Sequence, residues 1–262
     1  MNLPSGKAVK KHLKRHFLLW IVFGLILILA GGYLDGYRVG PGLTVVRVGT
    51  LIVAGVPDGT GVYVDQAFRG ESKGGDLYAP LVPGTHTVIV DAPKDEPWQT
   101  FVAITSNQTT IVWPILVAKE PASTELAGAD ASNARSIIER NTLPTETAPL
   151  AVGCTHIYVS DNRIIAAPGE GCDIPDYLCT DGACAPTIVY APVEPIRSVL
   201  AFPERDDALI VATGEWIYAI AVDPRSPQFF APVAHGKMPV VAAGKDKSLL
   251  VQDGARSYSL SL

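Results

Sequence analysis

The sequence lacks the motifs that mark the common nucleotide-binding sites. It contains no Gly-x-x-x-x-Gly-Lys-Ser/Thr phosphate loop and no Gly-x-Gly-x-x-Gly turn. Its cysteines are not spaced as the paired Cys-x-x-Cys-type knuckles of a structural zinc site. No catalytic residue, metal ligand or cofactor-binding residue can therefore be named. We expect a protein that is not an enzyme and binds no cofactor.

The first 34 residues lack acidic side chains. Residues 1–16 hold five Lys and Arg residues, and residues 17–34 hold no charge and are mostly apolar. A helix of this second segment is about 27 Å long, close to the thickness of the hydrocarbon core of a bilayer. The sequence predicts a basic cytoplasmic tail over 1–16 and a single transmembrane helix over 17–34.

The rest of the chain lacks a basic excess. It holds 16 Lys and Arg residues against all 26 Asp and Glu residues, a net charge of −10. Such a body argues against nucleic-acid binding, which needs a basic face. By the positive-inside rule, the basic N-terminus stays in the cytoplasm and the body is extracytoplasmic at the cell membrane.

Two interpretations of the apolar segment remain open. A cleaved signal peptide has a shorter apolar core and a small-residue site, for which Ala30-Gly31-Gly32 is a candidate. The apolar run continues past this site, and Trp20 and Tyr33 suit the two membrane interfaces. We therefore favour a retained anchor. A buried core helix is disfavoured because the segment is apolar on every face.

Cysteine is absent before residue 154. The four cysteines, Cys154, Cys172, Cys179 and Cys184, all follow the anchor, and their number is even. On the oxidising side of a membrane this favours two disulfides over free thiols or a metal site. Three pairings are possible, of which Cys154–Cys172 with Cys179–Cys184 closes the shortest loops and is preferred.

Helical periodicity is absent from residues 43–117. Short segments rich in β-branched residues alternate with turns every eight to twelve residues. This rhythm predicts a small antiparallel β-sandwich.

Two motifs in this region resemble the PEGA family. They are Leu51–Asp65, with the turn Pro57-Asp-Gly-Thr60 before Val62-Tyr-Val-Asp65, and Leu81–Val90, with Pro83-Gly-Thr-His86. The naming Pro-Glu-Gly-Ala turn is matched at two of four positions. The resemblance covers about residues 46–117 and implies a small extracytoplasmic β domain of an envelope protein, with no catalytic activity or cofactor.

The PEGA-like turn residues also have structural explanations. Gly59 and Gly84 permit positive φ, and Pro57 and Pro83 preset φ before each turn. We expect Asp65 to accept hydrogen bonds from amides of the following loop, and His86 to be a structural hydrogen-bonding residue. These are the positions Pro57, Gly59, Asp65, Pro83, Gly84 and His86.

Residues 118–150 are small and polar and predict an interdomain linker with, at most, short helical turns over 135–140. Residues 151–262 return to strand patterning and predict a β-meander. Its predicted strands are 155–160, 163–167, 187–190, 198–202, 208–213, 216–222, 228–231, 240–243, 248–252 and 257–260. Its rhythm, clearest over 196–223, resembles propeller-type repeats that follow PEGA-like domains in some bacterial envelope proteins. Two or three such units are too few to close a ring. Three arrangements remain open: an open β stack, a remnant of a longer propeller, or subunits that complete one another. For an open stack, we hypothesise that the cysteine-containing insertion 169–185 caps one sheet edge.

Four aromatic residues are candidates for binding sugars or a partner if they are exposed, although core packing is the favoured interpretation for each tryptophan. They are Trp98, Trp113, Phe229 and Phe230. The leading hypothesis is a non-catalytic, single-pass envelope protein that binds cell-surface polysaccharide, surface-layer material or a protein partner. The alternative is an accessory extracytoplasmic subunit of a membrane-bound enzyme or secretion assembly.

Overall fold

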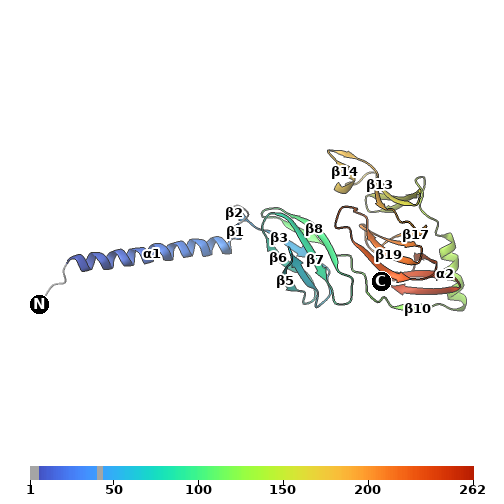
Figure 1. The fold of residues 1–262 in the computed structure, drawn as a ribbon, viewed down its shortest axis with the longest axis horizontal. Coiled ribbons are helices and arrows are strands. Elements are labelled where there is room, and N and C mark those ends of the chain that lie inside the picture. The colour runs from blue at the N-terminus through green and yellow to red at the C-terminus, as the bar shows by residue number, and fades with distance from the viewer. Residues whose placement is uncertain (1–5, 40–43) are drawn as a thin grey trace. The chain divides into compact units, whose positions relative to one another are not determined.

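The fold is mainly β, as the sequence predicts. The computed structural model describes residues 6–39 and 44–262, with the side chains of residues 6–16 and 18 left out. It contains a long N-terminal helix, α1 (Gly6–Leu34), a shorter helix, α2 (Gly128–Arg140), and several small, mostly antiparallel sheets (Figure 1).

Helix α1 begins well before the span predicted over 17–34. Residues 1–5 of the basic segment lie outside the described residues, as do the side chains of 6–16 and of Leu18. In the part of the chain described with its side chains, no helix is both long enough and apolar enough to cross a membrane.

The strands between residues 37 and 112 form a hairpin and two sheets. The hairpin pairs β1 with β2, and the sheets have the strand orders β6-β3-β9 and β5-β4-β7-β8. The bounds are β1 (Tyr37–Val39), β2 (Val45–Arg47), β3 (Gly49–Val53), β4 (Gly61–Val64), β5 (Ala67–Glu71), β6 (Leu77–Leu81), β7 (Gly84–Asp91), β8 (Trp98–Ile104) and β9 (Thr109–Val112). Strands β3 and β9 run parallel, and every other pair with an assigned register is antiparallel.

The predicted single domain 43–117 differs from the observed division of the chain. Chain contacts separate two compact units, and the boundary falls inside this region: residues 76–86 and 102–112 belong to the first unit, while 55–75 and 87–101 belong to the second. The reason is that the chain passes repeatedly between the two sheets: β3, β6 and β9 belong to one, and the pairs β4–β5 and β7–β8 belong to the other.

The C-terminal region contains three four-stranded sheets, which we call sheets A, B and C. Sheet A has the order β11-β12-β13-β16, sheet B β17-β18-β19-β20, and sheet C β10-β23-β22-β21. The bounds are β10 (Ser123–Glu125), β11 (Leu150–Val152), β12 (Thr155–Ser160), β13 (Arg163–Pro168), β16 (Thr187–Tyr190), β17 (Ile196–Ala201), β18 (Ala208–Thr213), β19 (Trp216–Ala221), β20 (Phe230–His235), β21 (Pro239–Ala243), β22 (Ser248–Asp253) and β23 (Arg256–Ser261). The insertion between β13 and β16 adds a 3-10 turn (Asp176–Leu178) and the short strands β14 (Cys179–Thr180) and β15 (Ala183–Cys184).

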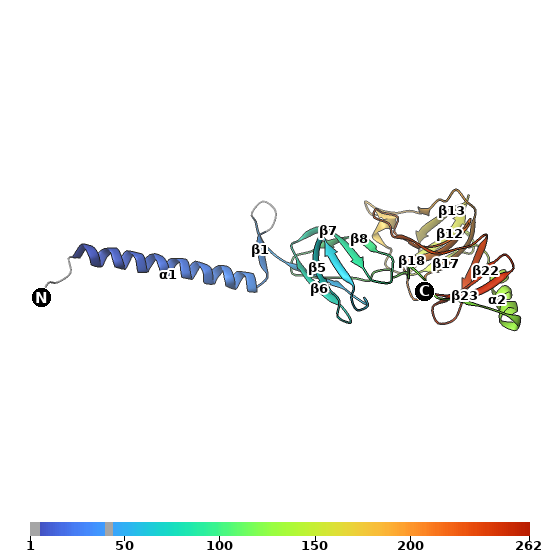
Figure 2. The same ribbon diagram turned by 60° about the horizontal axis from the view of Figure 1, so that its bottom comes forward.

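Sheet B lies between the other two sheets. Every residue of β18 is buried, so this strand is covered on both faces. On one face Leu209 and Val211 join a core with Ile157 and Ile164 of sheet A. On the other face β17 and β18 contact β21 of sheet C, and the Val241 amide donates to the Ser198 hydroxyl at 3.0 Å. Figure 2 shows these strands together.

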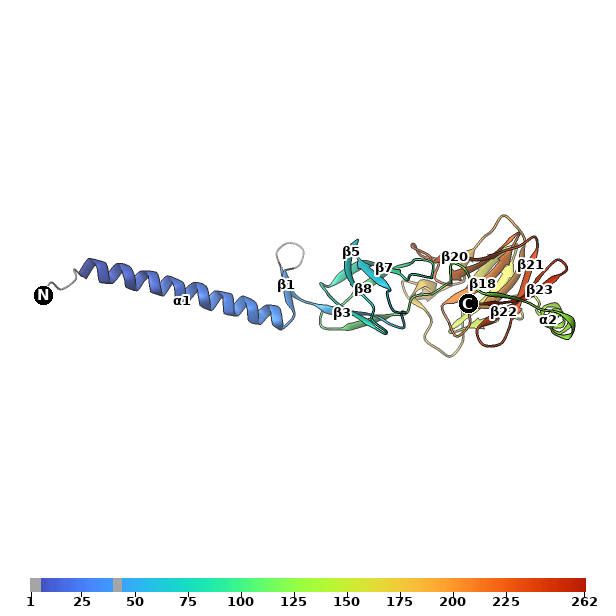
Figure 3. The same ribbon diagram turned by 90° about the horizontal axis from the view of Figure 1, so that it is seen from below.

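The sequence prediction for residues 118–150 was wrong in part. Strand β10 pairs with β23 and completes sheet C. Helix α2 lies against β22 (Figure 3) and buries Ala134 and Ile138, which are four residues apart and share one helix face. The low hydrophobicity suggested a bare linker, but two apolar side chains and one edge strand are enough to dock this segment onto an existing sheet.

The meander prediction for residues 151–262 agrees with the structure at a coarse level. Three meanders are present, and β12, β16 and β18 have the predicted bounds. Across the described residues the sheets do not form a closed propeller.

The cysteines pair as Cys154–Cys172 and Cys179–Cys184, the pairing that the sequence favoured. No free cysteine remains. Structural disulfides persist in oxidising compartments, so they suggest an extracytoplasmic location.

The docking of α2 predicts the effect of truncating its buried side chain. Ile138→Ala is expected to lower the free energy of unfolding by about 2–4 kcal/mol, because it leaves a cavity under the helix. Urea denaturation of the purified full chain measures this loss. The matched control is Ile137→Ala, whose side chain is half-buried and whose loss is expected to be smaller. Equal, negligible losses from both variants would contradict the docking.

Candidate functional site

Strand β19 creates an exposed aromatic surface through the alternation of its side chains. Trp216, Tyr218 and Ile220 point to the same side of sheet B because side chains in a strand alternate with a period of two. Ile220 is fully buried in the core shared with sheet A, and Tyr218 is only partly covered by that core. Trp216 is 37% exposed. The burial provided by sheet A therefore decreases along β19 toward Trp216.

Residues from neighbouring strands extend this surface into a row, which we call the aromatic strip. It consists of Tyr190, Phe230, Tyr218, Trp216 and His235. Ring centroids are 5.3 Å apart for Tyr190 and Phe230, 4.5 Å for Phe230 and Tyr218, and 6.0 Å for Tyr218 and Trp216. His235 meets Trp216 edge-on at 4.7 Å. The five rings thus form a continuous chain of contacts across β16, β19 and β20.

Two carboxylates flank the aromatic strip. A Cβ atom on Gly214 would overlap the Glu194 carboxylate, so that carboxylate lies against the β18–β19 turn. Gly214 has φ of +51°, which glycine adopts more readily than most residues. Glu215 in the same turn approaches His235, with 3.4 Å between Oε2 and Nε2. Both glutamates are exposed, so they can accept hydrogen bonds from a ligand.

The tyrosines of the strip stay protonated at neutral pH. Burial raises the pKa of Tyr190 above 10.0, and the neighbouring Tyr218 and Glu194 raise it further. Burial also raises the pKa of Tyr218, with Glu194 as the second cause. Both phenols can therefore donate hydrogen bonds.

This arrangement matches the chemistry of carbohydrate recognition. Aromatic ring faces offer flat apolar contact area at a low entropic cost, while tyrosine hydroxyls and carboxylates offer donors and acceptors. The two glutamates disfavour an anionic ligand. Among the described residues no three His, Cys, Asp or Glu side chains gather closely enough to hold a metal ion.

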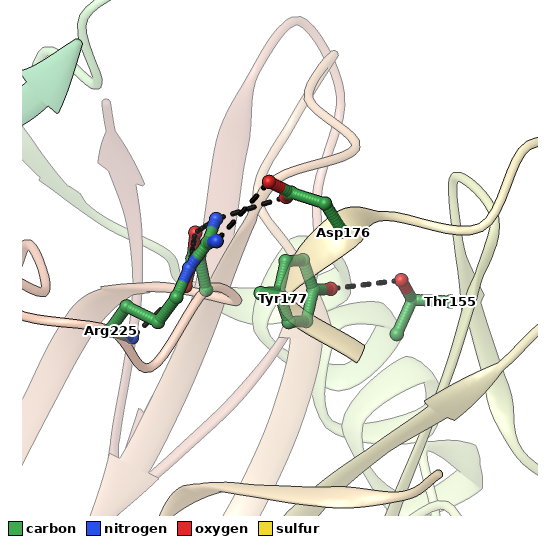
Figure 4. Close-up of polar contacts among 5 residues, drawn as sticks. Thr155, Asp176, Tyr177 and Arg225 are labelled. Carbon is green, nitrogen blue, oxygen red and sulfur yellow. Dashed lines mark hydrogen bonds and ion pairs between the residues drawn. The ribbon is translucent and has the colours of Figure 1, made fainter. Parts of the chain in front are cut away.

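A second polar cluster fixes the cysteine-containing insertion 169–185. The Arg225 guanidinium bonds both carboxylate oxygens of Asp223 and both of Asp176, the latter at 3.0 and 3.2 Å (Figure 4). Tyr177 lies beside this group, with its ring centroid 6.0 Å from the guanidinium carbon, and its hydroxyl is 3.0 Å from the Thr155 hydroxyl.

This cluster is structural. The hydrogen bond to Asp223 is the main reason that the pKa of Arg225 is raised, so the guanidinium stays charged. It joins the insertion to the loop between β19 and β20. Leu178 of the insertion is buried in the core of sheets A and B. The expectation that the insertion caps a sheet edge stays a prediction.

The residues of the first PEGA-like motif lie in turns. The Pro57 carbonyl accepts hydrogen bonds from the amide and the hydroxyl of Thr60, and Gly59 has φ of +78°. The Asp65 Oδ1 accepts a hydrogen bond from the amide of Thr87 at 3.0 Å, and the expected bond to an amide of the following loop stays a prediction. The pairing of β4 with β7 brings Thr87 beside Asp65.

The residues of the second motif lie at the start of β7. Pro83 precedes the strand, and Gly84 begins it with φ of +145°. His86 is buried, and its Nε2 lies 2.8 Å from the Val82 carbonyl oxygen. This local contact fits the structural role expected for His86.

The aromatic residues named from the sequence divide into two groups. Trp98 and Phe229 are 8% and 5% exposed and belong to the core, whereas Trp113 and Phe230 are exposed. Only Phe230 joins the aromatic strip. The sequence reasoning missed Trp216, Tyr218, Tyr190 and His235. The Trp-x-Tyr alternation of β19 was a visible signal, but the cross-strand register was not.

Comparisons with known proteins assign no family. No protein-family model matches the chain, and no curated protein matches it. One similar solved structure is that of a DUF3823 family protein from Bacteroides ovatus, with 8% sequence identity over 82% of this chain and 97% of that chain. Its TM-score of 0.22 supports no inference about fold or function.

The tyrosine environment predicts a pH-dependent stability. Folding raises the pKa of Tyr190 and Tyr218, so each contributes to the free energy of unfolding. This contribution is fully present below pH 10.0 and is lost as the pH rises through the folded-state pKa. Glu194→Gln is expected to shift tyrosinate formation, followed by ultraviolet absorbance, to lower pH. Glu215→Gln is the control, and it is expected to leave the titration unchanged. Superimposable titrations of the wild-type chain and Glu194→Gln would contradict this account of the strip.

Proposed function

We propose that the chain is a non-catalytic, single-pass envelope protein whose extracytoplasmic β domains bind a neutral polysaccharide through the aromatic strip. The observation that carries the ligand assignment is the row of five touching rings, flanked by the Glu194 and Glu215 carboxylates.

The anchor is supported by sequence and helix together. Helix α1 is continuous over 29 residues. Its described side chains run without a gap only over 19–34, and the sequence continues the uncharged run at Phe17 and Leu18. Leu25, Ile28 and most other large apolar side chains of this helix are exposed. A lone apolar helix of this kind needs a lipid environment.

The extracytoplasmic placement of the body has two independent supports. The basic residues before the helix favour a cytoplasmic N-terminus. Both disulfides lie beyond the helix, in sheet A and its insertion. Their persistence requires an oxidising compartment.

The finer domain types are part of the same proposal. The motif turns around Pro57 and Pro83 lie next to β4 and β7, as a PEGA-like domain requires. Sheets A and B are four-stranded meanders, and sheet C joins the meander β21–β22–β23 to the earlier strand β10. Four-stranded sheets of this kind are the units from which propellers are built. The C-terminal region is thus proposed to be an open, propeller-type stack.

One observation favours the alternative, an accessory subunit of a membrane-bound enzyme or secretion assembly. Tyr78, Ile52 and Ile111 are register partners across the sheet β6-β3-β9. Tyr78 and Ile111 are 64% and 53% exposed. An exposed apolar row on a sheet face suits a protein partner.

Removing one ring of the strip tests the proposed function. Trp216→Ala is expected to lower affinity for a soluble neutral glucan roughly tenfold or more, because aromatic residues dominate such contacts. Titration calorimetry of the full chain in detergent micelles measures the change. Trp113→Ala is the matched control, since Trp113 is also exposed but lies outside the strip.

Two results would contradict polysaccharide binding by the aromatic strip. Equal affinities for Trp216→Ala and Trp113→Ala would move the binding site elsewhere. Failure to bind any envelope polysaccharide, together with stoichiometric co-purification of one protein, would favour the accessory subunit.

A further inference from the structure

The β1–β2 hairpin presents an apolar face that the chain does not cover. Its register pairs Tyr37 with Arg47 and Val39 with Val45, so these four side chains share one face. All four are exposed, with Val39 at 66% and Val45 at 71%. A two-stranded hairpin is marginally stable at best in water by itself. The hairpin therefore needs another surface.

The hairpin is fixed to the end of α1. Only two residues, Asp35 and Gly36, lie between Leu34 and Tyr37, so the ends of the helix and the strand are at most about 10 Å apart. Arg38 donates to the Tyr33 carbonyl at 2.7 Å and to the Tyr37 carbonyl at 2.9 Å, and its guanidinium stacks 3.4 Å from the Tyr33 ring centroid. Arg38 thus caps the helix end while holding the hairpin beside it.

The composition of the hairpin suits a membrane interface. Tyr33 and Tyr37 are exposed at the end of an apolar helix, where aromatic rings gather at the level of lipid headgroups. Arg47 is exposed on the valine face, with its guanidinium 5.7 Å from the Tyr37 ring centroid. An arginine in this position complements lipid phosphate.

We infer that the hairpin lies on the outer surface of the membrane, with Val39 and Val45 at the headgroup–acyl boundary and Arg47 on a lipid phosphate. This inference rests on the proposed anchoring by α1, but not on polysaccharide binding. The hairpin would thus add a second membrane contact beside the anchor.

Depth measurements test the inference on the full chain. Because all four native cysteines are paired, a single added thiol can carry a fluorophore. Val45→Cys is the test position, Leu27→Cys in α1 the buried reference, and Val193→Cys, which is fully exposed, the aqueous reference. The labelled chains are placed in vesicles of phosphatidylcholine and phosphatidylglycerol that carry spin labels at the headgroup or deep in the acyl chains.

Each outcome has a distinct meaning. The inference predicts that headgroup labels quench the Val45 fluorophore several-fold more than deep labels, while deep labels quench Leu27 and neither quenches Val193. If Leu27 is quenched and Val45 behaves like Val193, the hairpin inference fails and the anchor stands. If Leu27 is not quenched by deep labels, the anchor fails as well.

The phosphate contact has its own test in the same vesicles. Arg47→Gln is expected to reduce headgroup quenching at Val45 in vesicles containing phosphatidylglycerol. Arg69→Gln, another exposed strand arginine, is the control and is expected to leave quenching unchanged. Equal quenching in both variants would show that Arg47 does not contact lipid phosphate.

Discussion

The burial of sheet B between sheets A and C is the constraint on which the C-terminal structure depends. A strand covered on both faces is expected to be mostly apolar, and β18 is apolar over its first five residues and ends in a buried threonine, Thr213. Its neighbour β19 is covered only in part, and its alternating side chains continue past the covered zone. Ile220 supplies the core, and Trp216, on the same side of the strand, supplies the surface. The aromatic strip is thus the exposed margin of the core that holds the sheets together.

Segments outside the meanders complete this stack. Strand β10 precedes sheets A and B in the chain and pairs with β23, the last strand of sheet C. The first and last strands of the C-terminal region are therefore hydrogen-bonded to each other. The insertion 169–185 contributes Leu178 to the core and is held by two disulfides and by the Arg225 ion pairs. Rigid support of this kind keeps the ring positions of a binding surface fixed, which reduces the entropic cost of binding.

Sequence patterns predicted the elements whose information is local. The strands β12, β16 and β18 were predicted with their observed bounds because β-branched runs there stand between turn residues. Strand β10 and the docked helix α2 were not predicted. The burial of Ile138 depends on its contact with sheet C, which the local sequence does not show. The candidate site was largely missed as well. Which of Phe229 and Phe230 faces outward depends on strand parity, and the contacts of Trp216 with His235 depend on register. The disulfide pairing was predicted because loop length alone favoured it.

The central claim is that the β body stands outside the cytoplasm, tethered by α1. Labelling of Val193→Cys and Ser5→Cys with a membrane-impermeant maleimide on intact cells tests it most directly, because no native thiol is free. The account predicts that position 193, which is fully exposed, reacts before lysis and that position 5 reacts only after lysis. The reverse pattern, with position 193 protected until lysis, would contradict the account.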